Sequence, residues 1–324
     1  MNTSCAASPA GINNRILEKL ACPKTHAPLN LRDGHLATVD GKNEYAISGA
    51  GIPLFAEKLC SIDAARQRDH YQAVAEKYVE NLGYPHTQEY MAYLDRMFMS
   101  HVLPGDLAEA AEICCGQGEL LHLANGRLKL GVGVDISPKM LEAAKKQHGH
   151  NTDFLFLQGD ATQLPLAGGQ FQSVFMFGGV HHVSDRRQLF AEVYRILRPG
   201  GHFYFREPVS DFFLWRWIRA IIYRISPALD AETERPLLWK ETVPVLKDAG
   251  LKLKAWYTYG FLGFCFFMNS DVLIFNRLLR FIPCIRALTR LWTHIDDLTA
   301  RLPGLGRSGL QVVGVAKKPL RKDP

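Results

Sequence analysis

Residues 112–118, EICCGQG, lie where a predicted strand, Ala110–Cys114, gives way to a helix predicted near residues 118–125. Gly116 and Gly118 carry no Cβ atom, so the backbone can turn sharply there and approach a ligand closely. Two glycines alone also fit an ordinary tight turn. Together with the flanking elements, they predict a strand–loop–helix unit with a ligand-binding loop.

Apolar strands alternate with amphipathic helices from residue 109 to about 206, which is typical of βαβ units and a parallel sheet. Further helices are predicted over 138–147 and 185–197. The later strands are predicted at Leu130–Asp135, Phe154–Gln158, Ser173–Phe177, Gly201–Phe205, Leu251–Tyr257 and Leu310–Ala316. With the last two strands joined as a hairpin, the sequence predicts an α/β fold with a seven-stranded sheet.

Acidic residues follow the second and third strands. Asp135 has the spacing at which a carboxylate can accept both hydroxyls of a ribose. Asp160 can accept from an adenine amino group, while the neighbouring amide faces a ring nitrogen. A dinucleotide site would need a third small residue where Leu121 stands, and a P-loop would need Gly-Lys-Ser/Thr, which is absent. The pattern favours a nucleoside without phosphates.

Four segments in this order resemble the motifs of class I S-adenosylmethionine (SAM)-dependent methyltransferases: EICCGQG at 112–118, GVDIS at 133–137, GDATQLP at 159–165 and LRPGG at 197–201. The resemblance implies a Rossmann-like sheet, SAM as the cofactor and methyl transfer as the activity. It implies cofactor contacts at Glu112, Cys114, Gly116, Gly118, Asp135, Ile136, Asp160, Ala161, Phe177 and Tyr78. Cys114 stands where the family usually has its first glycine, and we expect its small side chain to fit.

Two histidines follow the fourth predicted strand, in FGGVHH at 177–182. In similar enzymes this loop lies beside the reactive methyl group. Methyl transfer needs alignment of donor and acceptor, and a base where the acceptor carries a proton. We expect His181 to be that base, with His182 as a second candidate; alternatively, the pair packs against and caps the next helix. Glu207, after the fifth strand, is a further candidate base or cation-stabilising group.

Outside the sheet, residues 1–60 resemble a small Trm112-like module through ILEKLACP at 16–23 and GIPLF at 51–55. Zinc-binding versions need a second cysteine soon after Cys22, but Lys-Thr-His follows at 24–26 and the downstream pair is absent. We therefore expect a metal-free module that stabilises or dimerises the chain. Residues 61–108 are predicted to be helical and to cover the cofactor site, and 109–324 to form the SAM-binding domain.

Two insertions, at about 208–230 and 260–306, leave the carboxyl edge of the predicted sheet, where parallel strands bind ligands. All five tryptophans fall between residues 215 and 292. We therefore expect an aromatic cap over the acceptor, with candidate contacts at Tyr71, Trp215, Arg219 and Phe264. The cap's arginines could meet a phosphate, a diphosphate or an anionic lipid surface. The alternative is that the aromatic residues form the cap's own core and the arginines its solvated face.

The composition is that of an ordinary globular protein, with a net charge of +6 and 47% hydrophobic residues. No secretory signal and no apolar stretch of about 18 residues is present, so a cytoplasmic protein is expected, with peripheral membrane contact as an alternative. The leading hypothesis is O- or C-methylation of a small hydrophobic acceptor: an isoprenoid, quinone, polyketide or lipid. A nucleic-acid or protein methyltransferase and a non-catalytic SAM-binding module are the alternatives. The sequence argues against a nucleic-acid or protein methyltransferase, because it contains neither a dense basic stripe nor the Asn/Asp-Pro-Pro-aromatic signature.

Overall fold

A seven-stranded mixed sheet forms the centre of the computed structural model, which describes residues 12–56, 65, 68, 83–149, 151–225, 235–267 and 276–320. The strands are β4 (Glu109–Ile113), β5 (Leu130–Asp135), β6 (Phe154–Gln158), β7 (Phe171–Phe177), β8 (Leu197–Pro208), β9 (Lys252–Tyr259) and β10 (Gln311–Lys317). Their spatial order is β6-β5-β4-β7-β8-β10-β9. Strands β4 to β8 are parallel, and β10 runs antiparallel to both β8 and β9. The predicted sheet and its terminal hairpin are confirmed.

Strand β8 begins earlier than the predicted Gly201, at Leu197, within a segment that local sequence marks as a turn. Long-range pairing overrides that preference. Leu197 pairs with Phe171 of β7, and the backbone N–H of Gly200 donates to Lys318 O at 2.9 Å. A strand can form across this Pro-Gly segment because its neighbours on both sides supply hydrogen-bond partners.

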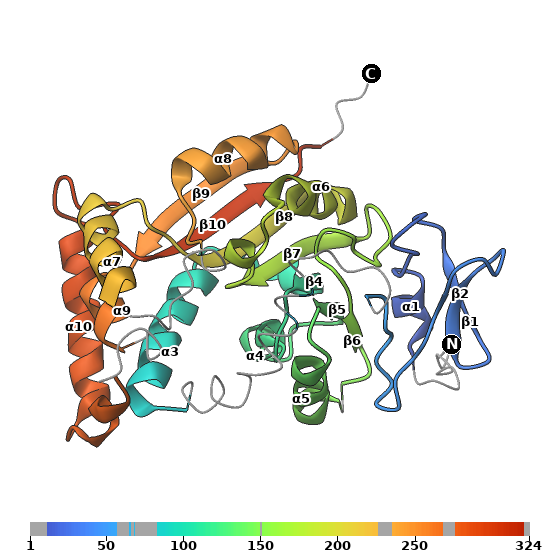
Figure 1. Cartoon of the computed structure of the whole chain (residues 1–324), viewed down its shortest axis with the longest axis horizontal. Helices are drawn as coiled ribbons and strands as arrows, with labels where there is room; N and C mark the ends of the chain where they lie inside the picture. The colour runs from blue at the N-terminus through green and yellow to red at the C-terminus, as the bar shows by residue number, and fades with distance from the viewer. Residues whose placement is uncertain are drawn as a thin grey trace.

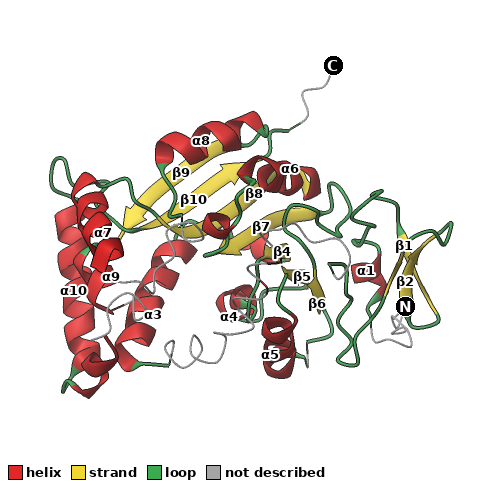
Figure 2. Ribbon diagram, in the orientation of Figure 1, coloured by secondary structure: helices red, strands yellow, loops and turns green. Residues whose placement is uncertain are grey.

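Four helices flank the sheet: α4 (Glu119–Ala124), α5 (Pro138–His148), α6 (Arg186–Ile196) and α8 (Trp239–Asp248). In the view of Figure 2, α6 and α8 lie above the strands, and α4 and α5 lie below them. Helix α6 begins where the Asp185 side chain accepts the Gln188 N–H at 2.9 Å, the usual role of an aspartate at a helix N-terminus.

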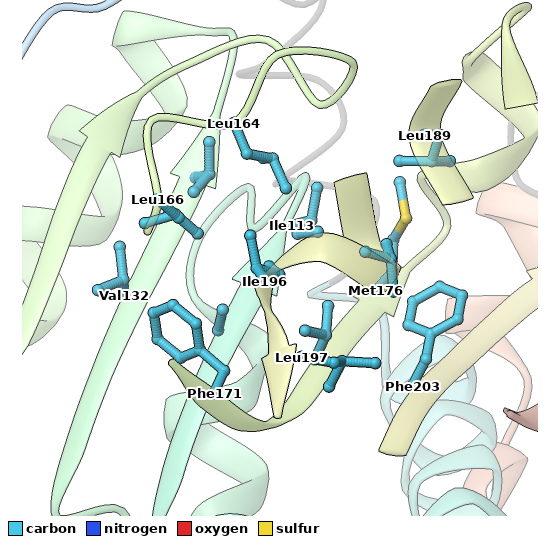
Figure 3. Packing of buried hydrophobic residues seen from close by; sticks show 14 of the residues in the cluster. Ile113, Val132, Leu164, Leu166, Phe171, Met176, Leu189, Ile196, Leu197 and Phe203 are labelled. Atoms are coloured by element: carbon cyan, nitrogen blue, oxygen red, sulfur yellow. The ribbon is translucent and has the colours of Figure 1, made fainter. Parts of the chain in front are cut away.

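The main core lies between the strands and α6. Figure 3 shows apolar side chains from neighbouring elements packed against one another. Ile113, Val132 and Met176 come from three adjacent strands, and Leu189 and Ile196 come from α6; all five are at most 1% exposed. This packing fixes the strands' carboxyl ends relative to one another.

The N-terminal module consists of α1 (Asn14–Leu17) and an antiparallel sheet of β1 (Leu29–Arg32), β2 (His35–Thr38) and β3 (Glu44–Tyr45). Asp33 and Gly34, with φ of 47° and 79°, form the turn between its first two strands. Ile16 and Leu36 belong to the same core cluster as Val132. The backbone N–H of Phe55 also donates to Gln158 O at 3.0 Å, at the edge of β6. The module therefore shares the core of the main sheet.

A group of helices stands at the opposite end of the molecule, at left in Figure 1. It contains α3 (Pro85–Met99), α7 (Phe213–Ile225), α9 (Leu262–Phe267), η3 (Asn276–Phe281) and α10 (Ile285–Ala300), and we call it the cap. Tyr90 and Tyr93 of α3 cluster with Trp215 of α7 and Phe264 of α9. The described helices of the cap thus come from both segments predicted as insertions and, in the case of α3, from the segment predicted to cover the cofactor site.

No helix in the described ranges is long and apolar enough to cross a bilayer. The same ranges contain no group of three or more His, Cys, Asp or Glu residues that could hold a metal ion. In the N-terminal module, the thiol of Cys22 is buried and lies 3.0 Å from the Tyr45 hydroxyl.

Candidate functional site

The loop after β4 contains three left-handed residues: Cys114, Gly116 and Gly118, with φ of 52°, 48° and 82°. Gly118 is the residue from which α4 starts. Glycine adopts this conformation readily, whereas a residue with a Cβ atom pays about 1–2 kcal/mol. Cys114 therefore holds the backbone in the form that a glycine would favour, at some cost in strain.

The carboxylate of Asp135 ties the end of β5 to this loop. One oxygen accepts the Gly116 N–H at 2.8 Å, and the other accepts the Ser137 N–H at 2.9 Å. Burial raises the pKa of Asp135, and the backbone donors partly oppose that rise. Ile136, the next residue, is partly buried.

Glu112 lies beneath the loop and is 1% exposed. Its Oε1 accepts the Leu120 N–H at 3.1 Å, at the start of α4. Its Oε2 is buried and has no hydrogen-bond partner within the described part of the chain. Burial raises the pKa of Glu112 well above its ordinary value. Because buried polar atoms are nearly always paired, this oxygen marks a place where a polar ligand group would be accommodated.

Asp160 follows β6, which pairs with β5. One carboxylate oxygen accepts the N–H and the hydroxyl of Thr162, at 2.8 and 2.7 Å. Ala161 is partly exposed beside it. Glu112, Asp135 and Asp160 thus stand at the ends of three neighbouring strands, in the order in which they occur along the chain.

His181 and Glu207 form a hydrogen-bonded pair at the ends of β7 and β8. The Nδ1 atom of His181 lies 2.8 Å from Glu207 Oε2, and the Glu207 side chain is fully buried. The other oxygen of Glu207 accepts the N–H groups of Gly179 and Val180, at 2.8 and 2.9 Å. With a carboxylate accepting at Nδ1, the neutral imidazole carries its proton there and leaves Nε2 as the basic nitrogen. The ring of His182 lies 3.8 Å from that of His181, measured between centroids.

The loops after β4 and β7 touch at Gly179. A Cβ atom placed there would lie 2.7 Å from the Cβ and 3.0 Å from the Sγ of Cys114, closer than atoms can pack. Only glycine fits this position without a shift of its neighbours. This contact brings the segment that carries His181 directly against the loop that begins at Cys114.

A buried arginine that the sequence reasoning did not single out lies beside these loops. Arg206 of β8, which is 5% exposed, forms ion pairs with Asp95 of α3, at 2.6 Å, and with Glu119 of α4. Its guanidinium also lies over the Phe177 ring, 5.3 Å from the centroid. Burial acts to lower the pKa of Arg206, but the two carboxylates outweigh it and raise the pKa overall. The sequence feature that could have identified Arg206 is its charge at the end of the otherwise aromatic segment 203–205.

The predicted acceptor residues lie in different surroundings. Trp215 and Phe264 are each 9% exposed and belong to the apolar core of the cap. Arg219 donates to the Ser210 hydroxyl at 3.3 Å. Tyr71 and Tyr78 lie outside the described residues.

A profile of the family described as "Methyltransferase domain" matches residues 111–205. The 2-phytyl-1,4-naphtoquinone methyltransferase of Thermosynechococcus vestitus is 35% identical over 108 residues, which is 32% of this chain and 46% of that protein. A demethylmenaquinone methyltransferase of Lactobacillus johnsonii is 38% identical over 106 residues, 31% of this chain and 43% of that protein. The chain therefore spans less than half the length of these relatives.

Two solved structures resemble the chain over most of its length. A SAM-dependent methyltransferase of Thermotoga maritima has a TM-score of 0.51 at 20% identity, covering 78% of this chain and 99% of that one. The cyclase SpnF has a TM-score of 0.53 at 14% identity, covering 79% of this chain and 97% of that one. The predicted Rossmann-like fold of class I methyltransferases is confirmed. Since a cyclase shares this fold, the reaction has to be argued from the site.

Proposed function

We propose that this chain is a SAM-dependent methyltransferase that acts on a small hydrophobic acceptor of the quinone type. The observation that carries the proposal is the close contact between Gly179 and Cys114, which joins the loop carrying His181 to the loop whose Gly116 N–H is bound by Asp135. The acceptor class is supported by the two relatives, a 2-phytyl-1,4-naphtoquinone methyltransferase and a demethylmenaquinone methyltransferase.

The residues at the strand ends fit the cofactor. Asp135 would hold the ribose hydroxyls, and Asp160 with Ala161 would hold the adenine. The unpartnered Oε2 of Glu112 lies below the loop expected to take the amino-acid end of SAM. The bound cofactor supplies the methyl group as an electrophilic sulfonium substituent.

His181 would act as a general base through Nε2, taking a proton from an acceptor hydroxyl as that acceptor becomes a nucleophile. Loss of the proton from a hydroquinone makes both the oxygen and the adjacent ring carbon nucleophilic, so one base serves O- or C-methylation. Glu207 would act by orienting the imidazole and fixing its tautomer rather than as a second base, because N–H donors occupy both of its oxygens. His182 would support the ring of His181.

The remaining segments would serve this chemistry indirectly. We propose that Trp215 and Phe264 form the core on which the cap covers the acceptor, with Arg219 near its polar end. Tyr71 and Tyr78 stay candidate contacts from the preceding segment. We also propose that residues 12–56 are a Trm112-like module that stabilises the sheet from within the chain, through the shared core around Ile16 and Leu36.

The test measures transfer of a tritium-labelled methyl group from SAM to a prenylated 1,4-naphthohydroquinone, together with SAM binding by calorimetry. Asp135→Ala should abolish SAM binding. His181→Ala should retain SAM binding but lose at least about 100-fold in turnover. His182→Ala is the matched control, with a much smaller loss expected. Unchanged SAM affinity in Asp135→Ala would refute the cofactor site, and full turnover in His181→Ala would refute the assigned base.

We also propose that the chain contacts a membrane surface peripherally. A prenylated quinone partitions into lipid, so the acceptor would be met at a bilayer surface.

A further inference from the structure

Helix α10 turns polar side chains toward the protein. Its buried residues include Thr289, Thr293 and Asp296. The two oxygens of Asp296 accept the N–H groups of Leu262 and Gly263 at the start of α9, at 3.0 and 2.8 Å. Asp296 thus ties the inward face of α10 to α9, while Ile285 and Trp292 supply the apolar contacts of that face, so the leucines of this helix are not part of the cap core.

The leucines of α10, and Leu302 just after it, point outward instead. Leu288, Leu291, Leu298 and Leu302 are 37%, 56%, 63% and 53% exposed, and we call them the leucine stripe. Leu288, Leu291 and Leu298, spaced by three and seven residues, lie on one side of α10, and Leu302 follows just after the helix ends at Ala300. A surface helix ordinarily turns its apolar residues toward the core, whereas these leucines face away from it.

The 3₁₀ helix before α10 continues the apolar surface. Leu278, Phe281 and Ile282 are 58%, 70% and 39% exposed. Because η3 adjoins α10, exposed apolar residues on both elements indicate an interaction surface. In Figure 1, α10 forms the outer edge of the cap, with the sheet on its other side.

The charge around this surface is mainly positive, although Glu89 of α3 pairs with Arg290 at 3.4 Å. Residues 276–307 contain six arginines and two aspartates. The six arginines are all exposed: Arg277, Arg280, Arg286, Arg290, Arg301 and Arg307. Of the aspartates, Asp296 is buried, and Asp297 is partly buried and accepts the Tyr93 hydroxyl at 2.5 Å.

We propose that the leucine stripe and its neighbouring arginines dock this chain onto the surface of an anionic lipid bilayer. The leucines would enter the headgroup boundary, and the guanidinium groups would pair with lipid phosphates. A second copy of the chain is a poorer occupant, because a two-fold interface would bring this arginine-rich surface against itself. The inference deepens the proposed function, since a prenylated acceptor lies in the same bilayer, but docking requires neither methyl donor nor acceptor.

The experiment is co-sedimentation with vesicles of phosphatidylcholine, with and without phosphatidylglycerol. The wild-type chain should bind the anionic vesicles and bind the neutral ones weakly. Leu291→Asp combined with Leu298→Asp should weaken binding more than tenfold. Arg286→Gln combined with Arg301→Gln should weaken it about fivefold for each arginine removed. Val39→Asp, at a position 63% exposed on the N-terminal module, is the matched control and should bind like wild type.

SAM affinity and the melting temperature of each variant establish that it is folded. Wild-type failure to bind anionic vesicles, or equal binding by the double-aspartate variant, would overturn the proposal. A dimer seen without vesicles and lost in the double-aspartate variant would reassign the face to self-association. Vesicle binding without methyl transfer would count against the proposed function alone, because docking is measured with neither SAM nor acceptor present.

Discussion

Replacing Glu207 with glutamine should invert the tautomer of His181. Glutamine keeps the shape of glutamate but offers one accepting oxygen and one NH₂ group. If its oxygen keeps the N–H groups of Gly179 and Val180, at the present 2.8 and 2.9 Å, its NH₂ group faces His181 Nδ1. Nδ1 must then accept, so the ring proton moves to Nε2. The opposite orientation would set an NH₂ group against these two close backbone donors, whereas the expected one sets it against the more distant backbone N–H of His181 alone, 3.4 Å from Oε2.

The size of the effect follows from which bonds change. Nε2 no longer accepts a proton, so turnover should fall by the contribution of a general base, about 100- to 10,000-fold. The bonds from the two backbone donors lose their charge assistance, at about 1 kcal/mol each. Glu207→Gln should therefore lower the free energy of unfolding by about 2 kcal/mol, while Asp135 and Asp160 remain in place and SAM affinity stays near its wild-type value.

Two assays separate the tautomer from the chemistry. Nitrogen-15 NMR of histidine-labelled protein reports directly which ring nitrogen of His181 carries the proton, and it needs no acceptor. Methyl transfer to a prenylated naphthohydroquinone reports turnover. His182→Gln is the matched control, since it changes the neighbouring ring and leaves the Glu207 contact intact. A Glu207→Gln protein whose His181 keeps its proton on Nδ1, or one with near wild-type turnover, would refute the reasoning.

The remaining predictions concern stability, measured by denaturant unfolding. Cys114→Gly should be about 0.5–1 kcal/mol more stable than Cys114→Ala, the reverse of an ordinary position, because relief of the left-handed strain exceeds the entropy cost of glycine; the usual order would contradict the strain. Gly179→Ala should cost about 1–3 kcal/mol by overpacking, and part of this should return in the double variant with Cys114→Gly. Burial holds the pKa of Glu112 above its unfolded value, so the stability that protonated Glu112 contributes is present below pH 4.5 and is lost as the pH rises through the folded pKa. The free energy of unfolding of Glu112→Gln should therefore rise relative to that of wild type across that pH range. A difference between the two proteins that does not change with pH would contradict this. Arg206→Met should cost about 3–5 kcal/mol by stranding two carboxylates, whereas Arg187→Met, which removes the exposed ion pair of Arg187 with Asp248, should cost under about 1 kcal/mol.

The sheet was predictable because its strands carry strong local signals. The bounds of β5 and β6 match the predicted Leu130–Asp135 and Phe154–Gln158, where apolar runs end at polar residues. The start of β8 was not, because pairing of Leu197 with β7 depends on residues far away in the chain. Helix α8 was not placed either: it contains Pro244, a residue that usually argues against a helix interior.

The same division applies to the candidate site. Asp135 and Asp160 could be proposed from sequence because each directly follows a strand, and adjacent parallel strands end at one edge. The pairing of Arg206 with Asp95 could not, since these residues are far apart in the chain and meet only when α3 packs against the sheet. The role of Trp215 depends likewise on α3, whose tyrosines complete the cap core.

The contact between Cys114 and Gly179 also constrains the evolutionary history of this site. A lineage that replaced Gly179 first would pass through an overpacked intermediate, whereas one that first changed Cys114 to glycine would leave only the flexible end of Met176, also 2.7 Å from such a Cβ atom, to shift. The two positions are therefore epistatic, and the order of their substitutions decides which sequences can be reached. Among homologues, we expect side chains larger than glycine at 179 to occur only where 114 is glycine.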